Sequence, residues 1–413
     1  MNISKKDRDR LRELAKKQIE YANSPVMQSR INEWYEHNDL SGQRPMIQIE
    51  TETFSHEIIP QMLFCESKKA REIEAQLLMN YVNYELFDDD YPVSPFFHLE
   101  WDIWFSLFNT QVKTVHAKDR SGNEMIAYRF EHVIKDLECD LSLLEETNYG
   151  VDKSGTLARK SMLEELFGDI LPVHIVSSSP VACITYEVVK LMGMERMMFA
   201  LCECPDAFHE LIDRVTNDFL VFFKWEEREE LLLPTNGYNK VHWGTWGFTR
   251  ELPSQSPCLL NQTWGYMNSQ ESVCISPDMY GEFIFPYYKK IADLFGLFSY
   301  GCCEPVDPCW EKYLSKLGNL RKISISPWCN EEYMAEQLRG RKIIYHRKPN
   351  PGFISTNETF NEDKFTDHIA FTLRAAKGCK LEFTLRDIYT INNDINRARR
   401  AILIIREQID KLW

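Results

Sequence analysis

The chain has 413 residues, of which 44% are hydrophobic and 13% aromatic, so it can bury a large core without disulfide bonds. Its 48 basic and 62 acidic residues give a net charge of 48 − 62 = −14, which argues against nucleic acid and anionic membranes as partners. The sequence starts without an apolar signal segment, no apolar run approaches ~18 residues, and the twelve cysteines suggest reduced thiols, so we expect a cytoplasmic protein.

The first 44 residues predict a helical extension ahead of the main domain. Residues 4–24 have the spacing of an amphipathic helix, with Ser4 as a candidate N-cap and with Leu11, Leu14 and Ile19 on one face. The dense charges on the opposite face indicate a helix that lies on the outside of the domain.

Short β-like runs and helical patterns alternate along the rest of the chain. The eight β-like runs are 45–52, 171–178, 240–246, 271–277, 297–303, 320–327, 342–349 and 379–386. The helical patterns are 206–231, 280–295, 308–317, 330–338, 360–376 and about 394–411. Such alternation implies parallel strands joined by crossover helices, and eight units predict an α/β fold, a single (β/α)8 TIM barrel over 1–413. A doubly wound open sheet is the competing fold, and the lack of a Gly-rich turn after any strand weakens it.

The interval 83–155 is too long for one strand–helix unit. It contains FDDDYPVSPFFHLEWDIWFSLFN, which is rich in aromatic and acidic residues. We interpret this interval as an insertion after the first strand that covers the barrel top, and the triple acid as a solvated loop tip.

In a TIM barrel, the reacting groups lie at the carboxyl ends of the strands. The candidate catalytic residues there are Glu50, His242, Lys348, Arg386 and Asp387, and the candidate substrate-binding residues are Trp246, Tyr300, Glu304, Trp328 and Asn350. The cations could bind a substrate carboxylate, and a salt bridge within the protein is the alternative. Polar residues also alternate along the last strand, in LEFTLRD, which favours a polar site over a purely structural ion-pair network.

Two adjacent thiols, Cys302 and Cys303, end the run 297–303. Because successive strand residues point to opposite faces, at most one of them should face the barrel axis, and the sequence does not decide which. Cys329 and Asp278 follow neighbouring predicted strands, so an inward thiolate could form a zinc site with them. Ordinary packing of the thiols is the alternative.

The stretches YGCCEPVDPCW, NLRKISISPW, HRKPNP and LEFTLRDIYT, together with VVKLMGMERMMFALCECPDAFHELIDRVTNDFL, resemble the uroporphyrinogen decarboxylase superfamily over roughly residues 160–410. The resemblance implies a (β/α)8 barrel. One branch of that superfamily decarboxylates uroporphyrinogen without a cofactor, and its Arg-rich N-terminal signature is absent here. The other branch comprises cobalamin-dependent methyltransferases, whose zinc is held by a His-x-Cys pair and a distant Cys. In this chain Tyr300 matches the histidine and Cys302 the cysteine, while Arg386 or Asp387 stands at the distant position, so that zinc set is not intact.

This resemblance is strongest to the methyltransferase branch, and it implies methyl transfer between a small methylated substrate, such as a methoxylated aromatic, and a corrinoid on a partner protein. Zinc would polarise the atom that bears the methyl group. The alternatives are a metal-free decarboxylase or lyase that acts on a small carboxylated substrate, and a ligand-binding barrel that has lost catalysis.

Overall fold

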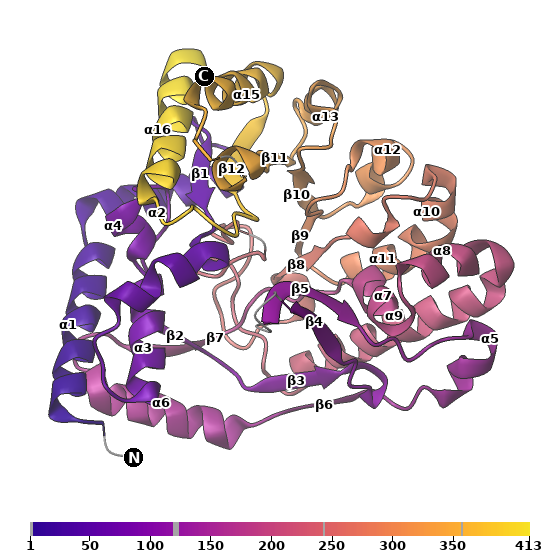
Figure 1. Ribbon diagram of the computed structural model, residues 1–413, viewed down its shortest axis with the longest axis horizontal. Helices are drawn as coiled ribbons and strands as arrows, with labels where there is room; N and C mark the ends of the chain where they lie inside the picture. Colours follow the sequence, from indigo (N-terminus) through magenta and orange to yellow (C-terminus); the bar gives the residue numbers. More distant parts are fainter. Residues whose placement is uncertain (1–2, 119–123, 243, 357) are drawn as a thin grey trace.

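A six-stranded parallel sheet forms the centre of the computed structural model, which describes residues 3–118, 124–242, 244–356 and 358–413 (Figure 1). Its strands follow the order β1 (Met46–Ile49), β12 (Lys380–Leu385), β11 (Ile344–Arg347), β10 (Leu320–Ile325), β9 (Leu297–Tyr300) and β8 (Trp264–Met267). All five pairings are parallel, so the carboxyl ends of the six strands meet along one edge.

Two further parallel strands continue this arrangement beyond β8. The strands β2 (Phe97–Glu100) and β7 (Val173–Val176) pair with each other in parallel, and the chain after β7 makes a parallel bridge from Val181 to Tyr266 of β8. The eight strands lie around the central region of the molecule in Figure 1. This mixed α/β arrangement is compatible with a TIM-barrel-like fold.

Aspartate side chains line the seam between β1 and the segment that leads into β2. The backbone amides of Ile47 and Ile49 donate to Asp90 Oδ2 and Asp89 Oδ2 over 2.8 and 2.9 Å, and the Asp90 amide donates to the Ile47 carbonyl over 2.8 Å. Both aspartates are buried, whereas Asp88 is exposed. The interpretation of the triple acid as a solvated tip is therefore wrong for two of its three residues, because β1 needs acceptors on its second edge.

Helices cover the outside of the strands. The N-terminal helices are α1 (Lys5–Ala22) and α2 (Pro25–Asn38), and Ser4 caps α1 by accepting from the Asp7 amide, as predicted. The remaining α-helices are α3 (Lys68–Met79), α4 (Val82–Leu86), α5 (Leu137–Asp140), α6 (Lys153–Phe167), α7 (Ile184–Met192), α8 (Met194–Glu203), α9 (Pro205–Arg228), α10 (Pro277–Phe283), α11 (Phe285–Ala292), α12 (Asp307–Trp310), α13 (Glu331–Leu338), α14 (Gly352–Ser355), α15 (Glu362–Ala375) and α16 (Ile395–Leu412). Short 3-10 helices lie at Thr51–Glu57, Ile59–Met62, Leu107–Asn109, Leu141–Leu143, Leu260–Gln262, Gln270–Ser272 and Leu314–Lys316.

The interval 83–155 combines one strand of the central arrangement with two antiparallel pairs. It contains β2, then β3 (Ile103–Ser106) paired with β6 (Asn148–Val151), and the hairpin of β4 (Thr114–Lys118) and β5 (Glu124–Phe130). The chain after β5 is attached to α7, because the amides of Val133 and Ile134 donate to the Leu191 carbonyl. That this interval covers the barrel top stays a prediction.

Six of the eight predicted strands are present, and two are not. In the run 240–246, of which residue 243 lies outside the described residues, Lys240 and Trp246 form an isolated antiparallel bridge, and the described residues belong to no strand. The predicted strand at 271–277 is wrong, because Gln270–Ser272 form a 3-10 helix and Ser276 caps α10. Of the central strands, β2 and β8 were not predicted. Both have only four residues, and in β8 all four are buried, so this strand shows no alternation of exposed and buried residues.

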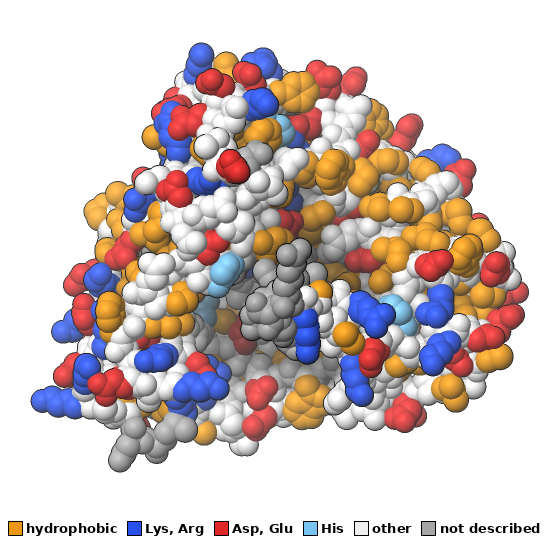
Figure 2. Space-filling view, in the orientation of Figure 1, with side chains coloured by type: hydrophobic (Ala, Val, Ile, Leu, Met, Phe, Trp, Pro, Cys, Tyr) orange, Lys and Arg blue, Asp and Glu red, His pale blue; other side chains and the backbone are white. Residues whose placement is uncertain are grey.

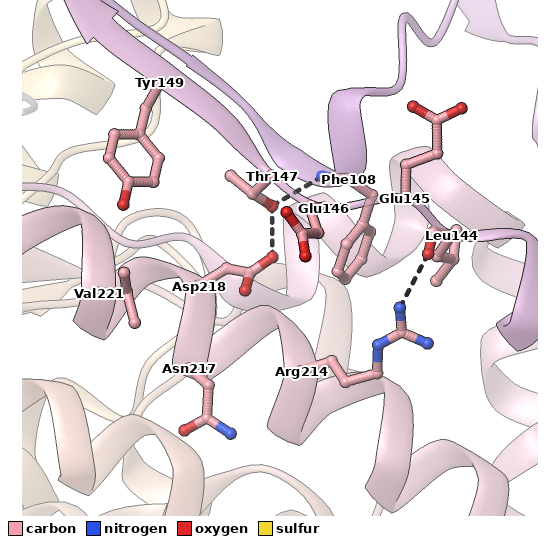
Figure 3. Close-up of a pocket in the computed structure, with 10 residues that line it drawn as sticks. All are labelled: Phe108, Leu144, Glu145, Glu146, Thr147, Tyr149, Arg214, Asn217, Asp218 and Val221. Carbon is pink, nitrogen blue, oxygen red and sulfur yellow. Dashed lines mark hydrogen bonds between the residues drawn. The ribbon is translucent and has the colours of Figure 1, made fainter.

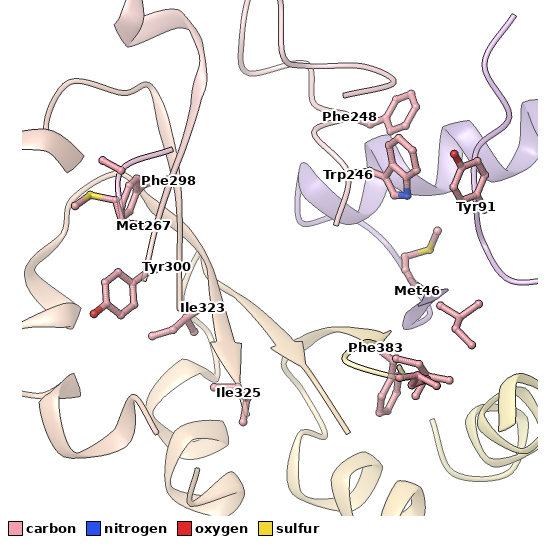
Figure 4. Close-up of a cluster of buried hydrophobic side chains, with 14 of the residues drawn as sticks. Met46, Tyr91, Trp246, Phe248, Met267, Phe298, Tyr300, Ile323, Ile325 and Phe383 are labelled. Carbon is pink, nitrogen blue, oxygen red and sulfur yellow. The ribbon is translucent and has the colours of Figure 1, made fainter. Parts of the chain in front are cut away.

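Polar and apolar residues alternate along the central strands. The polar members on one face are Gln48, Glu50, Lys322, Ser324, His346, Lys348, Glu382, Thr384 and Arg386, and all of them are buried. The alternate residues, among them Phe298, Tyr300, Ile323 and Phe383, belong to the hydrophobic core (Figure 4). A buried polar face is unusual for parallel strands that only pack, so it marks the region where chemistry is expected.

The surface carries mixed charges. On the face shown in Figure 2, basic and acidic side chains are interspersed, and the face is hollowed near its centre. In the part of the chain that the structure describes, no helix is both long enough and apolar enough to span a membrane.

Candidate active site

The thiol pair lies directly beyond β9, where Gly301 interrupts the strand with a φ of 94°. This conformation favours glycine and interrupts the alternation of side chains between the two faces of the strand. The alternation therefore does not determine which of the two cysteines faces inward. Cys302 Sγ lies 3.4 Å from Cys303 Sγ, and Cys303 Sγ donates to Asp387 Oδ2 over 3.1 Å. The two thiols therefore lie together, beside a carboxylate from the end of β12.

Two buried cations raise the acidity of Cys302. The contact with Cys303 and then the positive charges of Lys348 and Arg386 lower the pKa of Cys302 to about 7, against the effect of burial. The contact with Cys302, burial and the Asp387 carboxylate raise the pKa of Cys303. Of the two thiols, Cys302 is thus the one that ionises near neutral pH.

Lys348 and Arg386 reach this region from the ends of β11 and β12. Lys348 is 3% exposed, and its Nζ lies 3.4 Å from the Gly301 carbonyl oxygen. Arg386 donates to Asp387 Oδ1 over 3.0 Å, and its Nε lies 3.6 Å from Glu50 Oε2. The three strands β1, β11 and β12 thus bring two acids, Glu50 and Asp387, and two cations to the thiol pair.

Burial changes the protonation of the surrounding acids and bases. It raises the pKa of Glu50, although Arg386 acts in the opposite direction. Burial and then the charges of Arg386 and Lys348 lower the pKa of His242 to about 4, so this imidazole is neutral at pH 7. For Asp387, burial would raise the pKa, but Arg386 and the Cys303 thiol lower it, and the carboxylate stays ionised.

A buried ionic network lies on the same face of the strands, further from their carboxyl ends. Lys322 Nζ donates to Glu382 Oε2 over 2.9 Å, and His37 Nε2 from α2 lies 3.1 Å from the same oxygen. His346 Nε2 lies 2.8 Å from Thr384 Oγ1. The sequence reading did not select Lys322 or His346, although polar residues at every second position of LRKISI and HRK could have indicated them.

Several predicted substrate-binding residues lie elsewhere or are already engaged. Tyr300 points to the helix layer, where its hydroxyl lies 2.9 Å from that of Tyr280 in α10. Glu304 accepts from the amides of Ser269 and Cys302, so it ties the loop after β9 together.

The other three predicted substrate-binding residues have local roles or face solvent. Asn350 Oδ1 accepts from the Gly352 amide within its own turn. Trp246 is buried against Tyr91, with the ring centroids 5.1 Å apart. Trp328 is 70% exposed, on the loop after β10.

The structure does not assemble the predicted zinc set. Asp278 is in the first turn of α10 and pairs with Lys312 on the surface, because the strand predicted to carry it is not formed. Cys329 Sγ accepts from the Val306 amide and lies 3.5 Å from Ser326 Oγ. Across 3–118, 124–242, 244–356 and 358–413, no group of three or more His, Cys, Asp or Glu side chains is placed to hold a metal ion. The residues predicted to hold zinc therefore do not fit this ion.

Two cavities contact α9, which lies outside the central strands. One, of about 360 Å³, lies between the helix and residues 144–149 (Figure 3). Its cation Arg214 donates to the carbonyls of Leu141 and Leu144, while Asp218 accepts from Thr147 Oγ1. The other, of about 260 Å³, lies at the carboxyl ends of β2 and β7.

Comparisons with known proteins give a similarity of fold. Neither protein-family models nor curated protein sequences match the chain. Among solved structures, the chain is similar to a methyltransferase from Methanosarcina mazei, with a TM-score of 0.51 and 12% sequence identity over 92% of this chain and 98% of that one. At this identity the similarity concerns the fold.

Proposed function

We propose that the chain is a methyltransferase in which β1, β2 and β7 to β12 form a (β/α)8 barrel with the active site at their carboxyl ends. The substrate would be a small methoxylated aromatic carboxylate, and a corrinoid on a partner protein would be the second substrate, which accepts the methyl group. The observation that carries this proposal is the acidic thiol of Cys302 between Lys348 and Arg386. The fold shared with a methyltransferase supports it.

In this mechanism the two cations bind the substrate carboxylate, and Cys302 acts as a general acid. When the methyl carbon–oxygen bond breaks, the electron pair stays on the aromatic oxygen, which takes the proton of Cys302. A group with a pKa near the working pH is the most effective acid, and Lys348 and Arg386 stabilise the thiolate that remains.

The direct test is methylation of free cob(I)alamin by 3-methoxybenzoate, followed by the absorbance of the corrinoid. We expect turnover with the wild-type chain, a rate that falls as the pH rises above about 7, and a loss of about 100-fold or more with Cys302→Ser. Cys329→Ser is the matched control, because its thiol is engaged elsewhere. Methoxybenzene, which lacks the carboxylate, should react much more slowly.

Two buried cations beside a carboxyl group of raised pKa also favour a second candidate, a metal-free decarboxylase or lyase. Release of carbon dioxide from a carboxylated substrate without any methylation of the corrinoid would replace the methyltransferase proposal with this one. Elemental analysis of the same protein tests the zinc prediction. If wild type holds about one zinc per chain and the double variant Cys302→Ser/Cys303→Ser holds none, zinc is bound by the thiol pair after all.

A further inference from the structure

The cavity at the carboxyl ends of β2 and β7 has an unusual lining. Glu100 and Trp101 follow β2, the serines 177–179 follow β7, and α9 closes the other side with Phe222, Phe223 and Glu226. Its volume is about 260 Å³, which is enough for a small organic molecule. It lies at the same end of the strands as the thiol pair, but none of the residues assigned to methyl transfer lines it.

Glu226 is the main anomaly in this cavity. Within the described residues its carboxyl group makes no hydrogen bond and no ion pair, and only its backbone carbonyl accepts, from the Leu231 amide. The adjacent Glu227 carboxylate, by contrast, accepts from the Leu260 amide over 2.6 Å. Burial alone raises the pKa of Glu226 to about 8, without a contribution from any charge. A carboxyl group held in this way costs free energy unless a ligand supplies its partner.

The titratable side chains among the described residues that line the cavity are acids, without a cation beside them. Glu100 accepts from Ser178 Oγ at the end of β2, and it is the only other titratable residue among those described that line the cavity. No described lysine or arginine lines it. Trp101 Nε1 is buried without a hydrogen-bond partner in the described chain, and the rings of Phe222 and Phe223 form apolar walls.

We propose that this cavity binds a small organic cation of the alkylammonium class. Two carboxyl groups supply the charge, and the aromatic rings offer faces that attract a cation bearing alkyl groups. An anionic ligand would face two acids with no compensating base. This site is independent of methyl transfer, and its failure would leave the proposed function untouched.

Release of a proton when the cation binds would distinguish this site from an apolar cavity without a carboxyl group. At pH 7, about nine-tenths of Glu226 is protonated, because its pKa is about 8. A cation bound beside it favours the carboxylate, so binding should release nearly one proton per chain.

The probe is tetramethylammonium, which carries a permanent charge and no proton of its own. Calorimetric titration of the full-length chain at pH 7, in two buffers of different ionisation enthalpy, counts the released protons. We expect binding with a release of about 0.9 proton, and Glu226→Gln should abolish the release and weaken binding about tenfold. Glu100→Gln should weaken binding but keep the release.

Two controls complete the test, a matched variant and an uncharged ligand. Glu210→Gln removes a charge from an exposed position of the same helix and should change nothing. tert-Butyl alcohol, which has nearly the same shape without the charge, should not bind. The proposal is overturned by a lack of binding to wild type, by equal binding of the alcohol, or by unchanged proton release in a Glu226→Gln chain whose circular dichroism shows that it is folded.

Discussion

Lys348 controls the ionisation of a thiol that it does not touch. It lies near the Gly301 carbonyl, one residue before Cys302, and its charge is one of the causes that lower the pKa of this thiol to about 7. We predict that Lys348→Met raises this pKa by about 1 unit. The measurement is the ultraviolet absorbance of the thiolate against pH, taken as the difference between each chain and its Cys302→Ser form.

The matched control for this titration is Lys342→Met, since Lys342 is exposed at the opposite end of β11. It should leave the midpoint where it is in wild type. An unchanged midpoint in Lys348→Met would show that Cys303 and Arg386 set the acidity of Cys302 without Lys348.

Glu226 should make the stability of the protein depend on pH. Its pKa is about 8 in the folded chain and near 4.5 when unfolded, so the folded state binds the proton more tightly. The resulting stabilisation is present at low pH and is lost as the pH rises from about 4.5 to about 8. We predict that Glu226→Gln removes this loss and is more stable than wild type at pH 8 by on the order of 2 kcal/mol.

Urea unfolding at several pH values checks this prediction. Glu210→Gln, on the exposed side of the same helix, should follow the wild-type curve. If the two variants behave alike, the carboxyl group of Glu226 is solvated in solution.

At the scale of elements, the turn after β9 depends on Gly301. A Cβ there would lie 3.1 Å from Ser324 Cβ, and the φ of 94° disfavours any other residue. We predict that Gly301→Ala costs about 1–2 kcal/mol of unfolding free energy and moves Cys302 away from the cations. The variant should unfold at a lower temperature, and the pKa of Cys302 should rise because the thiol lies further from the cations.

Gly318→Ala provides the comparison for this turn. No atom lies within 4 Å of a Cβ at that position, and its φ is not in the left-handed region. It should change stability by less than about 0.5 kcal/mol. If Gly301→Ala leaves the free energy of unfolding unchanged, the loop after β9 can adopt another conformation.

The strands that could be predicted are those whose pattern is local. In β12, the residues that face the helices are apolar and those that face inward are polar, so period-two alternation shows in the sequence. In WGYM of β8 both faces are buried and Gly265 takes the place of a side chain because Phe295 packs against it. Such a strand has no alternation to detect.

Site residues could be predicted only where the end of a strand was predicted correctly. The expectation that reacting groups lie at the carboxyl ends of the strands selected Glu50, Cys302, Lys348 and Arg386, which the structure brings together. It failed for Asp278 because 271–277 is not a strand. His37 contacts Glu382 from α2, and no local sequence pattern predicts a contact between residues so far apart in the chain.

At the scale of the whole molecule, a buried charge cluster ties the N-terminal helices to the strands. Glu382 in β12 contacts Lys322 in β10 and His37 in α2, and all three are at most 1% exposed. Burial would raise the pKa of Glu382, but Lys322 and the two histidines hold it well below its ordinary value.

We predict that Lys322→Met destabilises the chain by about 3–5 kcal/mol, because it leaves a buried carboxylate without its main partner. The double variant Lys322→Met/Glu382→Leu should recover much of that loss, since it removes both charges. Denaturant unfolding of the two variants measures the difference. A double variant no more stable than the single one would show that the pair itself, and not the orphaned charge, is what the fold requires.

The aspartate seam beside β1 has a consequence for the way the chain is made. The strand that pairs with β1 in the finished sheet is β12, which is synthesised long after β1. Asp89 and Asp90, by contrast, emerge soon after β1 and can already satisfy the amides of Ile47 and Ile49. The nascent chain therefore has a local partner for one edge of β1 soon after that strand is made, and the other edge waits until β12 has been synthesised.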